Sequence, residues 1–130
     1  MSHFEKIKDY LLEMGFTFDQ ENKAEELVVV NDSERGINNL VIDCEDPILI
    51  LEQVVIKLED VDKSVYKRLL QINRELVHGA FCLDSSGEII LFRDTLQLEN
   101  LDLNELEGSV DALSLAMAEH GTELLSFAGK

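Results

Sequence analysis

The chain has 130 residues, of which 27 are acidic and 11 are basic, so its formal net charge is −16. A hydrophobic content of 45% beside 29% charged residues is typical of a folded globular protein and excludes a disordered one. Nucleic acid and anionic lipid are disfavoured as partners, because both are bound by clustered lysine and arginine. The charge favours a basic partner, or it is a solvated surface without a partner.

A chain of 130 residues predicts a single domain, residues 1–130, with one core of its own. Its first residues have neither a basic start nor an apolar stretch, so no signal peptide is expected. The longest apolar runs, such as the one at residues 48–51, are far too short to cross a bilayer. We therefore expect a cytoplasmic protein that does not bind membranes.

The first predicted element is a helix that begins at the capping pair Ser2 and Glu5 and ends at Gly15. A short extended piece at residues 16–18 and a polar connector at residues 19–25 follow it. Three strands are expected next, at residues 27–31, 37–44 and 48–58, the last with a bend near residues 52–53. Because the turns between them are short, an antiparallel meander is favoured. The apolar stripe of the helix is Phe4, Ile7, Leu11 and Met14.

A second helix is predicted to start at Asp60 or Asp62, either of which can accept hydrogen bonds from its first turn. Gly79 suits the left-handed position that follows a helix. A hairpin is expected over residues 80–84 and 88–93. Its second strand is apolar on both faces at residues 89–92, which predicts that it is covered on both sides. The apolar stripe of the second helix is Val65, Leu69, Ile72 and Leu76.

The last third of the chain is predicted to be an irregular link, residues 95–101, followed by a long acidic helix. Asp102 and Glu105 form the capping pattern at its start. Gly121 interrupts the helical pattern without needing to end it, since Leu124 and Leu125 continue the apolar content. Residues 94–129 include eight acidic side chains and no lysine or arginine, so this segment is expected to be a solvated outer surface.

Side chains with catalytic potential are sparse in this sequence. Of the three histidines, His78 lies near Cys82, and this is the one pairing that resembles a nucleophile and its base. A structural role for His78 at a helix end is the favoured interpretation. Cys44 and Cys82 both lie in apolar strands and are expected to be free thiols rather than a disulfide. The spacings of zinc, calcium and phosphate-binding motifs are missing, so we expect no metal, no cofactor and no enzymatic activity.

The predicted order of elements is helix, three strands, helix, two strands, helix. This order predicts an α+β fold, α-β-β-β-α-β-β-α, in which a mostly antiparallel sheet is packed with helices. A local pattern in the second half can be set beside it: Leu69-Leu70-x-x-Asn73-x-x-Leu76-x-x-Gly79-x-Phe81-x-Leu83-Asp84, the apolar strand at 89–92, and Leu96-x-Leu98-x-x-Leu101-Asp102 before a helix with Leu106, Val110 and Leu113.

Together the pattern and the element order resemble the type III secretion chaperone family, typified by the chaperone for the effector Tir, and the related YbjN-type bacterial domains. The resemblance implies a protein-binding chaperone or adaptor without a cofactor, usually a homodimer. It places the dimer contact on the second helix, at Val65, Leu69, Ile72 and Leu76. It places the contact with a segment of the partner protein at Phe4, Ile7, Leu11, Val28, Val30, Ile48, Ile50 and Val54.

Two other functions stay open at this point. The first is a YbjN-like regulatory or stress-associated protein whose partner is an endogenous bacterial protein, with no role in secretion. The second is an enzyme that uses Cys82 and His78. Fold is the safer inference from the resemblance, because one fold hosts many functions.

Overall fold

The computed structural model describes residues 2–60 and 62–128. Along the chain, one helix precedes the first four strands, a second helix separates them from the last two strands, and a third helix follows. The predicted domain, residues 1–130, also includes residues 1, 61, 129 and 130, which lie outside the described residues. The helices are α1 (His3–Glu13), α2 (Lys63–Asn73) and α3 (Leu103–Leu125), and the strands are β1 (Gln20–Asn22), β2 (Leu27–Asp32), β3 (Ile37–Glu45), β4 (Ile48–Lys57), β5 (Ala80–Leu83) and β6 (Ile89–Gln97), with a short 3-10 helix η1 (Ser33–Arg35).

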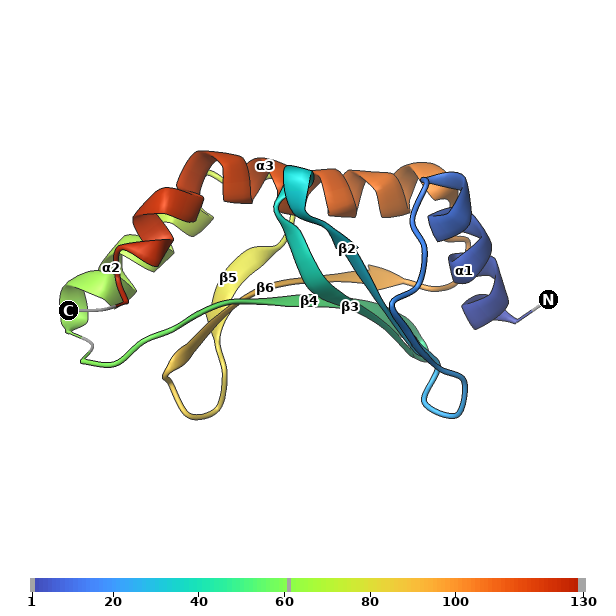
Figure 1. Cartoon of the computed structure of the whole chain (residues 1–130), viewed down its shortest axis with the longest axis horizontal. Coiled ribbons are helices and arrows are strands. Elements are labelled where there is room, and N and C mark those ends of the chain that lie inside the picture. The colour runs from blue at the N-terminus through green and yellow to red at the C-terminus, as the bar shows by residue number, and fades with distance from the viewer. Residues whose placement is uncertain (1, 61, 129–130) are drawn as a thin grey trace.

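The strands form one six-stranded sheet in the order β1-β2-β3-β4-β6-β5, and every neighbouring pair is antiparallel. All three helices lie on the same side of this sheet, with α3 running along its length and α1 and α2 at opposite ends (Figure 1). The predicted α+β fold is confirmed. The opposite face of the sheet has no helix over it within the described residues.

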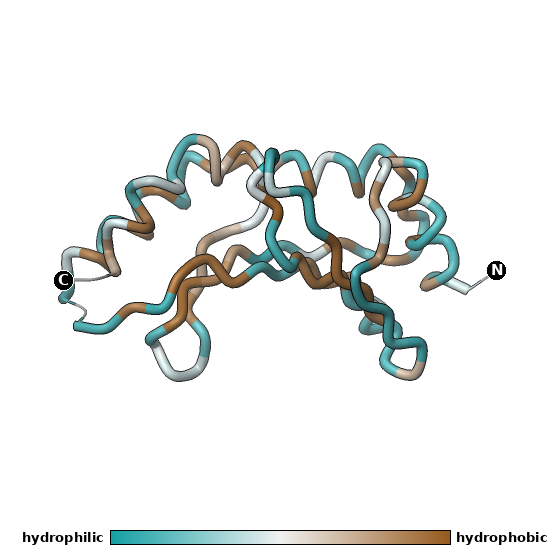
Figure 2. Tube along the Cα trace, viewed as in Figure 1, coloured by the Kyte–Doolittle hydropathy of each residue, from teal (hydrophilic) through white to brown (hydrophobic). Residues whose placement is uncertain are grey.

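The core lies between the helices and the covered face of the sheet. Hydrophobic residues follow the central strands, whereas the turn between β1 and β2 is hydrophilic (Figure 2). Side chains alternate along each strand, so every second residue of β3 and β4 enters the core. Fully or nearly fully buried residues include Phe4, Ile7 and Leu11 of α1, Val28 and Val30 of β2, Leu40 and Ile42 of β3, Leu49 and Leu51 of β4, Ile90 and Phe92 of β6, and Leu106, Val110 and Leu113 of α3.

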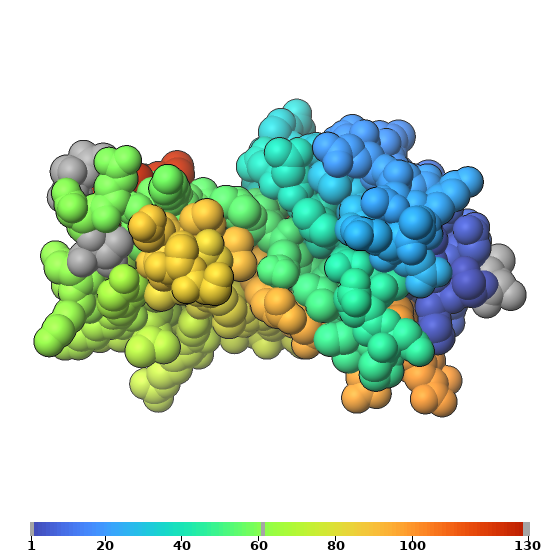
Figure 3. Space-filling view, turned by 90° about the horizontal axis from the view of Figure 1, so that it is seen from below, coloured from blue at the N-terminus to red at the C-terminus, as the bar shows by residue number. Residues whose placement is uncertain are grey.

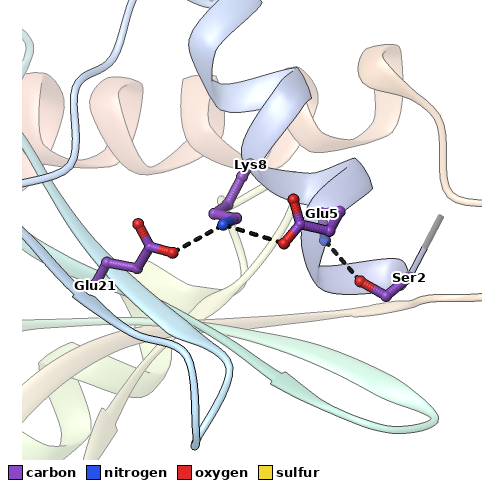
Figure 4. A network of polar contacts seen from close by, with 4 residues as sticks. All are labelled: Ser2, Glu5, Lys8 and Glu21. Carbon is purple, nitrogen blue, oxygen red and sulfur yellow. Dashed lines mark hydrogen bonds and ion pairs between the residues drawn. The ribbon is translucent and has the colours of Figure 1, made fainter.

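The edge strand β1 lies where the sequence predicts only a polar connector. Its three residues are all exposed, so no apolar alternation marks it as a strand. It pairs with β2, Glu21 lying opposite Val28, and Lys8 of α1 adds a side-chain contact, because its Nζ atom donates a hydrogen bond to Glu21 Oε2 at 2.8 Å (Figure 4). Lys8 also forms an ion pair with Glu5 of its own helix at 3.3 Å (Figure 4). At the start of the helix, Ser2 Oγ accepts a hydrogen bond from the Glu5 amide, as the capping pattern predicts (Figure 4).

The strand β6 is longer than predicted and continues to Gln97, through part of the expected irregular link. The reason is its pairing with β4, which runs from Lys57 opposite Ile89 to Ile48 opposite Gln97. The bend in β4 lies between Val54 and Ile56, slightly later than predicted, where the register shifts. Backbone hydrogen bonds to a long neighbour thus extend a segment that has little apolar periodicity of its own.

The helix α2 ends at Asn73, earlier than its predicted end near Gly79. The Asn73 side chain accepts a hydrogen bond from the Phe81 amide at 2.8 Å and donates one to the Phe81 carbonyl at 3.0 Å, which fixes the helix end to β5. Gly79 has a φ of +73°, but it lies in the loop before β5, not directly after the helix. A Cβ at Gly79 would overlap the ring of Phe92, so both the backbone angle and the close contact require glycine.

The helix α3 has 23 residues and therefore extends over about 35 Å. Its capping box is complete: the Asp102 carboxylate accepts from the Glu105 amide at 2.8 Å, and the Glu105 carboxylate accepts from the Asp102 amide at 3.3 Å. It continues past Gly121, as predicted. Arg68 of α2 binds Glu123 through two hydrogen bonds of 2.7 and 3.0 Å, which joins α2 to the far end of α3.

Candidate functional site

The sheet face that lies away from the helices is the first candidate for a functional surface. Figure 3 looks onto this face, whose middle is formed by strands. The residues that point outward here alternate with the core residues of the same strands. Some of them are apolar: Val41 of β3, Ile48, Ile50 and Val54 of β4, and Leu91 of β6.

A hollow of about 230 Å³ lies on this face, and we call it the sheet hollow; it is lined by Asn39, Val41, Asp43, Ile50, Glu52, Val54 and Leu91. The register brings these side chains together in rows, because Asp43 pairs with Ile50, Val41 with Glu52, and Val54 with Leu91. Val54 is the most open of the apolar residues, with 59% of its surface exposed. The hollow therefore combines apolar walls with two carboxylates.

The β6 segment at residues 89–92 is covered on one side only, in contrast to the prediction that both sides are covered. Ile90 and Phe92 are buried under the helices. Leu91 points the other way and lines the sheet hollow. The core therefore explains the apolar residues on the inner face of this strand. The outer face is not covered by any part of the chain that the structure describes.

The two carboxylates of the sheet hollow differ in their surroundings. Glu52 forms an ion pair with Arg93 of β6, Nη1 to Oε1 at 3.2 Å. Asp43 Oδ1 is buried and has no hydrogen-bond partner. Burial, followed by a hydrogen bond to Glu45 and the nearby charge of that group, raises the pKa of Asp43 to about 6. A carboxylate in this position is costly to ionise.

The residues predicted to contact a partner protein divide into two groups. Ile48, Ile50 and Val54 lie on the uncovered sheet face. The others are buried in the core between α1, α3 and the sheet, where they have no surface to offer a partner: Phe4, Ile7, Leu11, Val28 and Val30. Sequence reasoning missed Val41, Asp43 and Leu91; their period-two spacing places them on the face opposite the buried residues of their strands, but does not show which face is open.

Two of the four residues predicted to form a dimer contact are internal. Leu69 and Ile72 are buried against the rest of the chain, while Val65 and Leu76 are partly exposed. Their core positions follow from α2 packing on the sheet, which uses this stripe of the helix. The exposed apolar residues of this region are Tyr66, Leu70 and Val77, with Leu115 of α3. Leu76, Val77 and Leu115 line a common shallow hollow between the end of α2 and α3.

The two cysteines and His78 are the reactive side chains that the sequence singles out. Both cysteines are free, as predicted. Burial raises the pKa of the Cys82 thiol and raises that of Cys44 to about 12, so both stay protonated rather than becoming nucleophilic thiolates. His78 lines a hollow beside α3, together with Leu96, Gly108 and Asp111, and Cys82 is not among the residues that line it.

Metal ligands do not converge anywhere in residues 2–60 and 62–128. In this part of the chain no group of three or more histidine, cysteine, aspartate or glutamate side chains is placed to hold a metal ion. None of the helices found there has the length and apolar content required to span a bilayer.

Comparison with known proteins gave one family and several structures. The sequence model of the CesT_Tir_1 family matches residues 1–130. No curated protein sequence matches the chain. The fold is similar to that of YbjN from E. coli, a candidate transcription regulator, with a TM-score of 0.71 and 13% identity over 93% of this chain and 92% of that one.

Structures of chaperone complexes have the same fold. A chain of the HopA1–SchA chaperone–effector complex matches with a TM-score of 0.63 and 12% identity, over 88% of this chain and 89% of that one. A chain from the complex of the Yersinia pestis type III secretion chaperone SycH with a stable fragment of YscM2 matches with a TM-score of 0.61 and 12% identity, over 95% of this chain and 99% of that one. The resemblance predicted from the sequence is confirmed.

Proposed function

Because this chain belongs to the CesT_Tir_1 family, we propose that it is a non-enzymatic chaperone or adaptor that holds a segment of a partner protein in the cytoplasm. The uncovered sheet face is the observation that carries the proposal. Apolar side chains grouped on an open face are a frequent site of protein binding. The HopA1–SchA and SycH–YscM2 structures support the proposal, since each is a complex of a chaperone with a second protein.

The proposed contact uses the outward residues of the central strands. Ile48, Ile50 and Val54 are kept from the predicted set, and Val41 and Leu91 join them because they lie on the same face. Covering a fully exposed aliphatic side chain is favourable by about 1.5–3 kcal/mol, and the residues here that are already partly buried contribute less than this. A few such side chains supply enough free energy for a specific contact, provided that the bound segment keeps its own polar backbone groups hydrogen-bonded.

We also propose that the chain is a homodimer through the outer surface of α2. Leu70 is 73% exposed and Val77 is 78% exposed, and Tyr66 lies one turn before Leu70 on the same side of the helix. Leu115 of α3 extends this apolar surface. Leu69 and Ile72 support the surface from beneath, by fixing α2 to the core, rather than by touching the second copy.

A second candidate function is regulation of an endogenous bacterial protein without a role in secretion. The similarity to YbjN favours it, because that structure has a TM-score of 0.71 with this chain. Both candidates use the same surface and differ in the identity of the partner. Identifying the protein bound at the sheet face therefore separates them.

The experiment that tests the proposed function is site-specific photo-crosslinking in the source organism. A photoreactive residue, p-benzoylphenylalanine, replaces Val54 on the open sheet face. The control variant carries it at Glu107, which is exposed on α3 on the other side of the molecule. We expect Val54 to form a covalent adduct with one protein, identified by mass spectrometry, and Glu107 to form none with it. No adduct at Val54, or the same adducts at both positions, would contradict the proposal.

A further inference from the structure

The sheet hollow contains one carboxylate that is paired with a cation and one that is not. Arg93 neutralises Glu52. Asp43 lines the same hollow and has no ion pair among the described residues, and its Oδ1 atom lacks any hydrogen-bond partner there. A buried carboxylate oxygen without a donor is expensive, because it has lost water without gaining a replacement. The position is therefore suited to a donor that arrives with a ligand.

The charged groups that act on Asp43 are all acidic. Glu45 follows on the same strand, Glu52 lies on β4, and Glu25 lies in the turn between β1 and β2; all three raise the pKa of Asp43. Arg93, which pairs with Glu52 of the hollow, is already bound by that carboxylate. The local field therefore attracts a positive group and repels a negative one. A second copy of this chain, with its net charge of −16, is a poor occupant.

The apolar part of the hollow lies a fixed distance along the strands from Asp43. Asp43 is beside Ile50, and Val54 is beside Leu91, so the two rows are separated by four residues of β4. Four residues of an extended chain span about 13 Å, and their side chains at i, i+2 and i+4 point to the same side. An extended segment that follows β4 therefore presents residues four apart to the two rows.

We propose that the sheet hollow binds an extended segment of the partner protein in which a lysine or arginine pairs with Asp43 and an apolar residue four positions away lies on Val54 and Leu91. This inference rests on the proposed function and names the chemistry of the segment. The ligand's cation supplies the hydrogen-bond donor that the Oδ1 atom of Asp43 lacks. Its apolar side chain covers Val54, the most exposed apolar residue of the hollow. The ligand residue midway between the basic and the apolar one lies over Val41 and Glu52, a row with one apolar and one acidic side chain.

A displayed library of random 12-residue peptides tests the inference even while the partner protein is unidentified. The library is selected against the folded wild-type protein, against Asp43→Asn and against Asp9→Asn. The last is a matched control that removes one charge from an exposed position of α1. We expect the wild type and Asp9→Asn to enrich peptides with a basic residue four positions from an apolar one. Asp43→Asn should still enrich apolar residues but lose the preference for the basic residue.

Binding of one selected peptide, measured by fluorescence anisotropy, makes the test quantitative. Replacing its basic residue with norleucine, or using the Asp43→Asn protein, should each weaken affinity by about tenfold or more, and the two changes together should weaken it little further. Asp43→Lys should restore binding to a peptide with glutamate at that position. The affinity of the wild type should also fall from pH 7.5 to pH 5.5, because Asp43 has to lose its proton to bind the cation.

The possible failures have different meanings. Enrichment of apolar peptides without a basic residue, or equal affinity of the wild type and Asp43→Asn, would overturn the pairing with Asp43 and leave the proposed function standing. If no peptide is selected and Val54 crosslinks no protein, both the inference and the proposed function are overturned.

Discussion

Replacing Asp43 with asparagine should make the protein more stable at neutral pH, although Asp43 lies on a candidate binding surface. Its carboxyl group has a pKa of about 6 in the folded protein against 3.8 ordinarily. Because the folded-state pKa is the higher one, the folded state favours the protonated group. The stability that this group contributes is complete below the unfolded pKa, and it is lost as the pH rises through about 6.

The size of the effect follows from the pKa difference. A shift of this size corresponds to at most about 3 kcal/mol at 1.4 kcal/mol per pKa unit. Asp43 is partly exposed, so solvent screening reduces the cost, and we expect about 1 kcal/mol. Asp43→Asn removes the charge while keeping the shape of the side chain. The difference in free energy of unfolding between this variant and the wild type should grow between pH 4.5 and pH 6.5 and be constant from pH 7 to pH 9.

Urea denaturation, followed by circular dichroism at a fixed protein concentration, gives the free energy of unfolding at each pH. The Asp9→Asn protein is the control, and its difference from the wild type should vary little with pH. Chemical shifts of the Asp43 carboxyl carbon give the pKa directly. The reasoning is refuted if Asp43→Asn is less stable than the wild type at pH 7.5, or if the difference between them is the same at pH 4.5 and pH 7.

Three further predictions concern the exposed side of α2, two loop glycines and the ion pair between α2 and α3. Leu70→Asp should give a folded monomer by light scattering, whereas Ile72→Asp should lose about 4 kcal/mol or more and unfold; a folded Leu70→Asp dimer would remove α2 from the interface. Gly79→Ala should lose about 1–3 kcal/mol more in urea denaturation than Gly87→Ala, since both glycines have positive φ but only Gly79 faces a ring; equal losses would contradict this. The hydrogen bond and ion pair with Arg68 of α2 lower the pKa of Glu123, so the stability that this carboxylate contributes is lost as the pH falls. Glu123→Gln should therefore lower the free energy of unfolding at pH 7, and a loss of equal size in acid would contradict this prediction.

The fold was largely predictable because its signals are local. The Asp102 and Glu105 capping pattern, the apolar spacing of α1 and the turns between strands each depend on residues close in sequence. The elements that were missed or misjudged depend on distant residues. β1 is a strand because it pairs with β2, with an added contact from Lys8 of α1, and α2 ends where Asn73 binds the backbone of Phe81.

The candidate site was less predictable, for a geometric reason. Alternation along a strand shows that Ile42 and Asp43 point to opposite faces, but it does not show which face the helices cover. That choice became visible only when all three helices were found on one side (Figure 1). The raised pKa of Asp43 was hidden for a similar reason, because its main cause is burial by the folded chain, to which Glu45, Glu25 and Glu52 add smaller effects.

The order of the elements also has a consequence for the synthesis of this protein. The helix α3 follows every strand in the chain, yet it lies along the whole covered side of the sheet (Figure 1). Until the 23 residues of α3 have been added, this helix does not cover the inner sides of β4 and β6, which include Leu49, Leu51 and Phe92. At about 5–20 residues per second, that interval lasts roughly one to five seconds. The apolar inner face of the sheet is therefore exposed for a few seconds during synthesis, before α3 can cover it.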